Sequence, residues 1–326
     1  MGRLAATDDG VHAVPSAGDR AAVRLSVIVP ATDDPGTIDR CRRAIAAADE
    51  APSDVLVVET APGEGAAHAR NAGALEATGN VLVFVDADVA VHPDAFMRIR
   101  TAFERDPGLT ALFGSYDDTP SAPGVVSVFR NLLHHHVHQT ERTPAQTFWS
   151  GLGAIRRAAF EALGGFDTVL PAPSSVEDIE LGMRIVQRGG RIELDRRLRC
   201  THMKPWTFGN MLRTDLVRRG APWVGLLVAE RRLPASLNLR WRHRVSAACW
   251  VMALAALLRR RRLALLGSLS VSAWLNRSFY ALLRDRHGDR YALTGFFLHG
   301  LHHLTAAASV PLGVVIYLRD RRRGGR

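Results

Sequence analysis

The sequence predicts an α/β domain with a doubly wound sheet, followed by membrane-associated helices. In the first two thirds of the chain, short apolar runs alternate with segments of helical spacing, which is typical of a sheet covered by helices on both faces. In the last third, long apolar segments are separated by groups of arginines. We therefore expect a mobile tail over residues 1–22, an α/β domain over 23–235, and a membrane-associated helical region with a basic tail over 236–326.

The first half of the α/β domain consists of strands and helices in strict alternation. Strands are expected at residues 25–30, L-S-V-I-V-P, and at 54–59, D-V-L-V-V-E. Helices follow them over residues 37–48 and 66–78, and five apolar residues that begin at Val81 form the next strand. Ligands of such sheets bind beyond the carboxyl ends of the parallel strands.

The central strand, residues 81–89, reads V-L-V-F-V-D-A-D-V and carries two carboxylates near its end. Asp86 and Asp88 are spaced i, i+2, so on an extended backbone they project to the same side. Paired carboxylates suit Mg²⁺ or Mn²⁺ that also binds substrate phosphates. Because Pro30 and Glu59 end the neighbouring strands, the sequence predicts a site for a phosphorylated ligand. The alternative is an acidic turn without function, since Asp is common in turns.

A second acidic pair lies later in the chain. After a helix expected at residues 93–104 and a strand at 111–116, the segment 175–185, S-V-E-D-I-E-L-G-M-R-I, has helical spacing. Glu177 and Asp178 fall in its first turn, where a helix N-terminus favours negative charge. On spacing alone, a structural role for this pair remains open.

These motifs together resemble the nucleotide-binding half of family 2 glycosyltransferases, which have the GT-A fold with a mixed sheet. The matching letters are V-I-V-P, V-V-E and G-A-A-x-A-R-N-x-G-x-x-x-A-x-G-x-x-L-x-F-x-D-A-D. The resemblance implies that Glu59 contacts the nucleoside and that Arg70 lies near the diphosphate. It also implies that Asp88 holds the metal, with Asp86 beside it and nearer the ribose. Without the resemblance, Arg70 is equally explained as a helix-surface charge paired with Glu64.

The same resemblance covers the acceptor side. The pattern E-D-x-E-L-x-x-R-x-x-x-x-G, which begins at Glu177, implies that Asp178 is the catalytic base. The run F-W-S-G-L-G-A-I-R-R resembles the acceptor-side strand of the family and contains Trp149 and Gly151. Residues 59–61 and 31–32 differ from the family's usual residues after these two strands, which leaves the base of the nucleotide open.

Three further residues complete the expected site. His202 follows a strand and is a candidate metal or diphosphate contact, although a structural strand-end histidine is the alternative. Arg219 and Trp223, in L-R-T-D-L-V-R-R-G-A-P-W, resemble the Q-x-x-R-W segment that covers the acceptor in processive relatives. The Gln is absent here, which favours an enzyme that adds a single sugar.

Two groups of histidines remain without an assigned role. His134 and His138 are one helical turn apart and could bind a metal, but no H-E-x-x-H arrangement supports this. His299, His302 and His303 fall on one face of an apolar helix. Polar residues at membrane depth are often functional, yet packing or headgroup contact explains them as well.

Residues 291–318 form the best candidate for a membrane-spanning helix, because they contain no Lys, Arg, Asp or Glu. The apolar segments 245–258 and 263–275 are each too short to span alone. If they formed a hairpin, arginines 259–262 would face the non-cytoplasmic side, against the positive-inside rule. Helices that lie in the interface therefore remain an alternative to the hairpin.

Charge and cysteine content indicate the compartment. The net charge is +10 and the arginine groups flank apolar segments without an aromatic stacking pattern, which favours a membrane surface over nucleic acid. The three cysteines are scattered singly, so neither a disulfide framework nor a zinc ribbon is expected. Residues 1–22 resemble neither a signal peptide nor an anchor. We expect the cell membrane, with the catalytic domain in the cytoplasm.

The function expected from these features is an inverting, metal-dependent transfer of a sugar from a nucleotide-sugar donor to a hydroxyl acceptor. The acceptor is expected to be lipid-linked or a small membrane-associated molecule. A sugar-nucleotide nucleotidyltransferase is one alternative, but residues 31–36 are acidic where a triphosphate needs a Gly-rich, basic loop. A catalytically degenerate membrane scaffold is the other, against which both acidic pairs argue.

Overall fold

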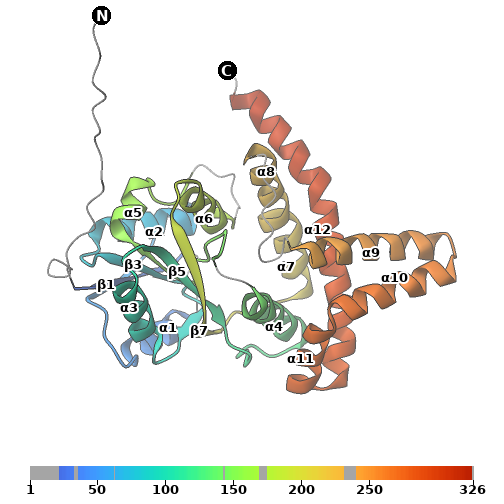
Figure 1. Cartoon of the computed structure of the whole chain (residues 1–326), viewed down its shortest axis with the longest axis horizontal. Coiled ribbons are helices and arrows are strands. Elements are labelled where there is room, and N and C mark those ends of the chain that lie inside the picture. Colours follow the sequence, from blue (N-terminus) through green and yellow to red (C-terminus); the bar gives the residue numbers. More distant parts are fainter. Residues whose placement is uncertain are drawn as a thin grey trace, which may run out of the picture.

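The computed structural model describes residues 22–32, 36–61, 63–141, 144–168, 175–230 and 240–324. The expected tail lies outside these residues, apart from Ala22, and so does the expected boundary between residues 235 and 236. An α/β lobe carries the sheet, and a lobe of helices packs beside it and leads to the C-terminus (Figure 1).

Seven strands form one mixed sheet in the order β2-β1-β3-β6-β5-β7-β4. The first three strands are parallel, as the alternation of strands and helices predicts. Strand β6 runs antiparallel between β3 and β5, and β4 runs antiparallel to β7. The strands are β1 (Leu25–Pro30), β2 (Asp54–Val58), β3 (Val81–Val85), β4 (Val89–Val91), β5 (Leu109–Tyr116), β6 (Leu152–Arg156) and β7 (Arg191–His202).

The central strand β3 is shorter than predicted. It ends at Val85, and Asp86 to Asp88 form a turn in which the Val89 amide donates to the Asp86 carbonyl at 3.0 Å. The prediction that both carboxylates lie on one extended strand is therefore wrong. The physical reason is that β3 pairs with β6 while the chain after the turn pairs with β7, three strands away in the sheet order. Both carboxylates nevertheless line the same cleft.

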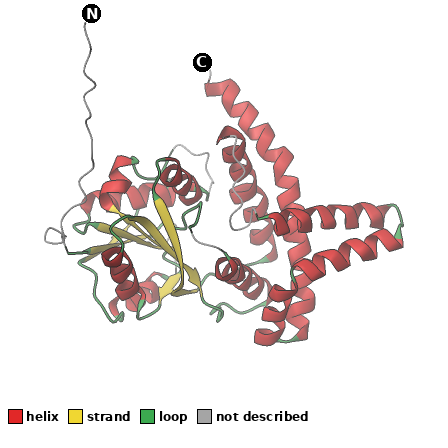
Figure 2. Cartoon of the chain, viewed as in Figure 1, coloured by secondary structure: helices red, strands yellow, loops and turns green. Residues whose placement is uncertain are grey.

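Helices cover both sides of the sheet, with α2, α5 and α6 above it and α1 and α3 below it in the view of Figure 1. Figure 2 shows the strands gathered in the middle of this lobe with helices on either side. The bounds of the predicted elements agree within a few residues, and the first strand has the bounds predicted. The helices are α1 (Ile38–Ala46), α2 (Gly65–Glu76), α3 (Ala95–Arg105), α4 (Val125–Thr140), α5 (Arg157–Ala162) and α6 (Glu177–Gln187).

The core of this lobe lies around β1 and β3, whose residues are all buried. Phe84 of β3 packs against the rings of Phe160 and Phe166, with ring centroids 5.5 and 5.0 Å apart. Each fully buried side chain of this size stabilises the fold by roughly 1.5–3 kcal/mol. The strand that leads to Asp86 is therefore held rigidly at its base.

The second lobe consists of helices that pack against one another and against α4. The long α12 lies beside α8, and its glycines allow close contact: a Cβ on Gly313 would lie 2.5 Å from the Ala221 carbonyl oxygen. The elements are α7 (Phe208–Arg213), the π-helix η1 (Thr214–Gly220), α8 (Ala221–Glu230), α9 (Trp241–Leu258), α10 (Arg262–Leu275), α11 (Arg277–His287) and α12 (Asp289–Gly324).

The helical lobe docks on the α/β lobe through α4. Phe129 and Leu132 of α4 are buried in one cluster with Phe279 of α11 and Leu298 of α12. Met211 of α7 belongs to the same cluster. Residues 208–230, which the sequence analysis placed in the α/β domain, thus pack with the C-terminal helices.

Helices α9 and α10 form the antiparallel hairpin that the sequence left open, and it projects away from the rest of the molecule (Figure 1). The turn between them is tight, and Arg260 adopts a positive φ of 53°. Large apolar side chains along both helices are exposed, among them Met252, Leu266 and Trp274. Among the described residues, one helix, 289–322, is long and apolar enough to cross a membrane.

Candidate active site

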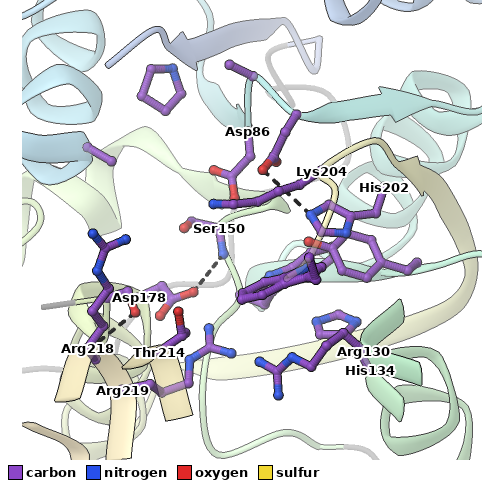
Figure 3. A pocket seen from close by; sticks show the side chains of 18 of the residues that line it. Asp86, Arg130, His134, Ser150, Asp178, His202, Lys204, Thr214, Arg218 and Arg219 are labelled. Carbon is purple, nitrogen blue, oxygen red and sulfur yellow. Dashed lines mark hydrogen bonds and ion pairs between the residues drawn. The ribbon is translucent and has the colours of Figure 1, made fainter. Parts of the chain in front are cut away.

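A cleft of about 600 Å³ opens beyond the carboxyl ends of β1 and β3, where the parallel sheet predicts a ligand site. Its walls come from both lobes: Pro30, Asp86 and Asp88 from the strand ends, and Arg218 and His302 from the helices. Figure 3 shows the side chains that face this space.

Arg70 is the residue that joins the two acidic centres. Its side chain is only 4% exposed; Nη2 donates to Asp86 Oδ1 at 2.8 Å and Nη1 donates to Glu177 Oε1 at 3.0 Å. The ring of Phe166 lies beneath the guanidinium at 5.4 Å. The alternative that Arg70 is a helix-surface charge paired with Glu64 is therefore wrong, because α2 turns this side chain into the interior.

Asp88 and His202, two residues expected to contact a metal, lie beside each other. Nε2 of His202 is 3.6 Å from Asp88 Oδ2, and its ring stacks on Tyr116 with centroids 4.3 Å apart. Burial opposes ionisation of Asp88, but His202 and Lys204 lower its pKa, so the carboxylate is charged.

The donor set fits a divalent cation. Asp86, Asp88 and His202 all line the cleft, and they offer carboxylate oxygens and one imidazole nitrogen. Oxygen ligands suit Mg²⁺, whereas a mixed oxygen and nitrogen set also suits Mn²⁺. These three residues are the ones that would hold the predicted metal.

Asp178 lies in the first turn of α6, at the other side of the cleft. It is 6% exposed, and the Ser150 amide donates to its Oδ2 at 3.3 Å. Burial and the neighbouring Glu177 carboxylate raise the pKa of Asp178 to about 6, which Arg219 and Arg70 only partly oppose. In Figure 3, Ser150 lies between Asp86 and Asp178.

Two glycines allow this arrangement. A Cβ on Gly182 would lie 2.1 Å from the Phe148 backbone nitrogen, so only glycine lets α6 approach the segment that precedes β6. A Cβ on Gly151 would lie 2.3 Å from the Trp149 indole. The expected acceptor-side residues Trp149 and Gly151 flank Ser150, whose amide binds Asp178, and the Gly151 carbonyl accepts from the Asp86 amide at 3.1 Å.

A second, small cavity of about 50 Å³ lies behind Asp178. Arg219 of η1 and Trp223 of α8 line it, together with Trp149 and His134. Four buried polar atoms of the lining residues have no hydrogen-bond partner among the described residues. They are Arg219 Nε, Trp223 Nε1, His134 Nδ1 and Thr147 Oγ1. Unsatisfied buried polar atoms are rare, so this cavity is suited to a polar ligand group or water.

Two predicted residues occupy less central positions. Pro30 lines the cleft at the end of β1. Glu59 is exposed just after β2 and is not among the residues that line the cleft, so its contact with a nucleoside stays a prediction.

The histidines of α4 are packed as neutral side chains. His134 stacks between Tyr116 and His138, with ring centroids 4.2 and 3.9 Å away. Burial lowers the pKa of His134 well below its usual value and that of His138 to about 4. Nδ1 of His138 donates to the Gly114 carbonyl at 3.0 Å, which fits the packing explanation.

The structure adds a polar network that the sequence analysis did not assign. Asp215 of η1 binds Arg130 of α4 at 2.8 Å and His302 of α12 at 2.8 Å. Burial opposes its ionisation, but these two neighbours lower the pKa of Asp215 to about 2. Arg130 and His302 line the cleft, so α12 reaches the site directly. The sequence shows that His302 is a polar residue in an apolar helix, but no local pattern predicts that Asp215 is its partner.

The mixed α/β sheet, with its cleft at the carboxyl ends of the parallel strands, has the GT-A glycosyltransferase fold. The mannosyltransferase PcManGT from Pyrobaculum calidifontis, solved in complex with GDP-Man and Mn²⁺, shares the fold: the TM-score is 0.51 at 19% identity, over 92% of this chain and 88% of that one. Residues 26–164 match the profile of Glycosyl transferase family 2. The chain therefore carries a family 2 glycosyltransferase domain.

Two curated relatives are similar over about half of this chain. N-acetylgalactosaminyltransferase 7 of Drosophila melanogaster is 27% identical in a 183-residue alignment that covers 48% of this chain and 31% of that protein. Probable N-acetylgalactosaminyltransferase 7 of Caenorhabditis elegans is 28% identical in a 185-residue alignment that covers 48% of this chain and 30% of that protein. The chain thus spans about a third of the length of these relatives.

Proposed function

We propose that this glycosyltransferase transfers a sugar from a nucleotide-sugar donor to a hydroxyl of a membrane-associated acceptor, with inversion at the anomeric carbon and with a divalent metal at the donor diphosphate. The observation that carries the proposal is the pair of acidic centres on one cleft, with Asp178 buried and Asp86 and Asp88 opposite it.

Asp178 is the proposed general base. Its pKa of about 6 leaves it ionised at neutral pH yet basic enough to accept a proton. As the acceptor oxygen bonds to the anomeric carbon, the hydroxyl proton passes to an Asp178 oxygen, and the bond from that carbon to the diphosphate oxygen breaks. This single displacement inverts the configuration and needs no enzyme nucleophile.

The donor would lie along the strand ends. Asp86, Asp88 and His202 would hold the metal, which would offset the charge that the leaving diphosphate gains. Arg70 holds Asp86 in place, and Lys204 at the rim adds positive charge near the diphosphate. The curated relatives carry the names of N-acetylgalactosaminyltransferases, while the similar mannosyltransferase was solved with GDP-Man and Mn²⁺. These names support a nucleotide-sugar donor without choosing its base or sugar.

The helical lobe supports an acceptor at a membrane surface. His302 of α12, the helix long and apolar enough to span a membrane, reaches into the cleft. Arg219 and Trp223 are proposed to contact the acceptor, since they line the cavity behind Asp178. A lipid-linked acceptor would therefore reach the base from the side of the apolar helices.

A screen of donor hydrolysis tests the proposal directly. Purified full-length protein is incubated with UDP-, GDP- and dTDP-sugars and Mn²⁺ or Mg²⁺, and release of the free nucleotide is measured. We expect one nucleotide class to be hydrolysed, with loss of turnover when EDTA is added and in Asp88→Ala. Absence of hydrolysis and of nucleotide binding by calorimetry for every donor would contradict the proposal.

A further inference from the structure

A second cluster of buried donors lies in the helical lobe, apart from the cleft. His243 of α9 and His299 and His303 of α12 are 7%, 1% and 2% exposed. One ring nitrogen from each lies within 4.8 Å of the others. His299 and His303 are four residues apart and so share one face of α12, and that face meets α9.

The hydrogen-bond partners of the His299 and His303 rings leave nitrogens available for a metal. Nε2 of both His299 and His303 is buried without a hydrogen-bond partner among the described residues. Nδ1 of His299 lies 3.1 Å from the Tyr280 hydroxyl. When Nδ1 donates to this hydroxyl, Nε2 carries the free lone pair, and metal-bound histidines are usually oriented by a partner in this way.

His243 contributes the third ring. Nε of Arg242 donates to its Nε2 at 3.3 Å, which is long for a hydrogen bond, so a metal bound at this nitrogen would displace that contact. Nε2 of His299 and Nε2 of His303 have no partner among the described residues, although a buried imidazole normally satisfies both of its nitrogens.

We propose that His243, His299 and His303 form a binding site for Zn²⁺ that links α9 to α12. Three imidazoles with an open fourth position are a known ligand set for this ion. Because the three ligands are neutral, the fourth position would be taken by a hydroxide or another anion that offsets the charge. The site is separate from the proposed donor metal, since none of the three histidines lines the cleft.

The consequence concerns the hairpin. Helices α9 and α10 project from the molecule and expose apolar residues, and α9 packs on α12 at the base of the hairpin, where the Trp250 and Phe296 rings meet with centroids 5.1 Å apart (Figure 1). Another fixed point is Gly300, where a Cβ would lie 2.4 Å from the Trp250 indole. A metal bound by His243 and the two α12 histidines would add coordinate bonds across this joint.

Cobalt titration tests the site with a readout other than activity. The full-length protein is purified in detergent with an affinity tag that contains no histidine, stripped with a chelator and titrated with Co²⁺. We expect an intense visible absorption band of four-coordinate cobalt that saturates at about one ion per chain and disappears when Zn²⁺ is added. The oxygen-rich site at Asp86 and Asp88 favours six-coordinate cobalt with weak absorption, so the band should persist in Asp88→Ala.

Variants assign the ligands. His299→Phe and His303→Phe keep the ring volume and should each abolish the band, whereas His287→Phe, a histidine of α11 outside the cluster, should retain it. Tyr280→Phe should lower the affinity for Co²⁺ roughly 10–100-fold, because it removes the group that orients His299. No band in the wild-type protein, or a band that survives in a folded His303→Phe, overturns the proposal. The wild-type titration decides by itself if a variant fails to fold.

Discussion

At the scale of single residues, Arg70 explains how two acidic centres coexist at one cleft. Its guanidinium donates to Asp86 with one nitrogen and to Glu177 with another, and it is almost fully buried. The two carboxylates pair with the one guanidinium, so the buried positive charge of Arg70 is not left without a partner in the low-dielectric interior. Lysine could not replace it, because a single ammonium lacks the planar fork that reaches both partners.

The first prediction concerns Asp178. Asp178→Asn removes the proton acceptor without changing the size of the side chain, so we expect sugar transfer to fall by roughly 10²–10⁴-fold. Nucleotide affinity, measured by calorimetry with Mn²⁺, should stay within a factor of a few. Glu76→Gln, which changes an exposed carboxylate at the end of α2, is the matched control and should leave both values unchanged. Full turnover in Asp178→Asn would exclude it as the base.

The second prediction is the pH dependence of the reaction. As the proposed base, Asp178 can accept a proton only as the carboxylate, and its pKa is raised to about 6. Below this pH the protonated fraction grows, so kcat/KM should fall with decreasing pH, approaching roughly tenfold per pH unit. A profile of kcat/KM between pH 5 and 8 at constant metal occupancy measures this. A flat profile down to pH 5 would show that another group limits the rate.

At the scale of elements, α6 and the segment before β6 act as a unit. The amide of Ser150 binds the Asp178 carboxylate, and Gly182 on the same helix meets the Phe148 backbone. The position of Asp178, the proposed base, therefore depends on how closely helix and strand approach, and not only on the first turn of the helix.

The third prediction follows from this contact. Gly182→Ala places a Cβ 2.1 Å from the Phe148 nitrogen, so α6 must move outward and carry Asp178 away from Ser150. We expect a loss of transfer of about 10²-fold, since small displacements of catalytic groups have effects of this size. Gly267→Ala in α10 meets no atom within 4 Å and serves as the control. Kinetics together with a thermal melt separate misplacement from unfolding, and unchanged kinetics in Gly182→Ala would argue against the proposed coupling.

At the scale of the whole molecule, the helical lobe is part of the site. Arg130, Asp215 and His302 form one network across α4, η1 and α12; Asp215 is buried at its centre, and Arg130 and His302 line the cleft. The exposed apolar surface of the α9–α10 hairpin lies on the outer side of the same lobe (Figure 1). A large exposed apolar surface marks a contact with another apolar phase, which is here proposed to be lipid.

The fourth prediction tests that contact. Leu266 of α10 is 61% exposed and Leu75 of α2 is 87% exposed, and each is replaced by cysteine. The three native cysteines are buried. In vesicles, a membrane-impermeant maleimide should label Leu75→Cys readily and Leu266→Cys only after unfolding in SDS, because a thiol in lipid does not ionise. Equal labelling of both variants in intact vesicles would show that the hairpin faces water.

Much of the fold was readable from local patterns. Strands β1, β2 and β3 follow from short apolar runs. The helical spacing of residues 175–185 predicts α6, and Val176, Ile179 and Met183, which recur at this spacing, are buried. The end of β3 differs from the prediction. A strand ends where its pairing with the neighbouring strand ends, and the position of β6 beside β3 depends on tertiary contacts. The hairpin remained open for the same reason: its formation depends on contacts between helices rather than on either helix alone.

The sequence by itself determined the sheet, the two acidic pairs and the class of chemistry, since residues close in the chain carry these signals. Only the tertiary structure decided which of those residues meet. Arg70 and Glu177 are 107 positions apart, and Asp215 and His302 are 87 apart. His243 joins His299 and His303 across two connecting helices. Such contacts result from the packing of whole elements, which periodicity and spacing do not encode.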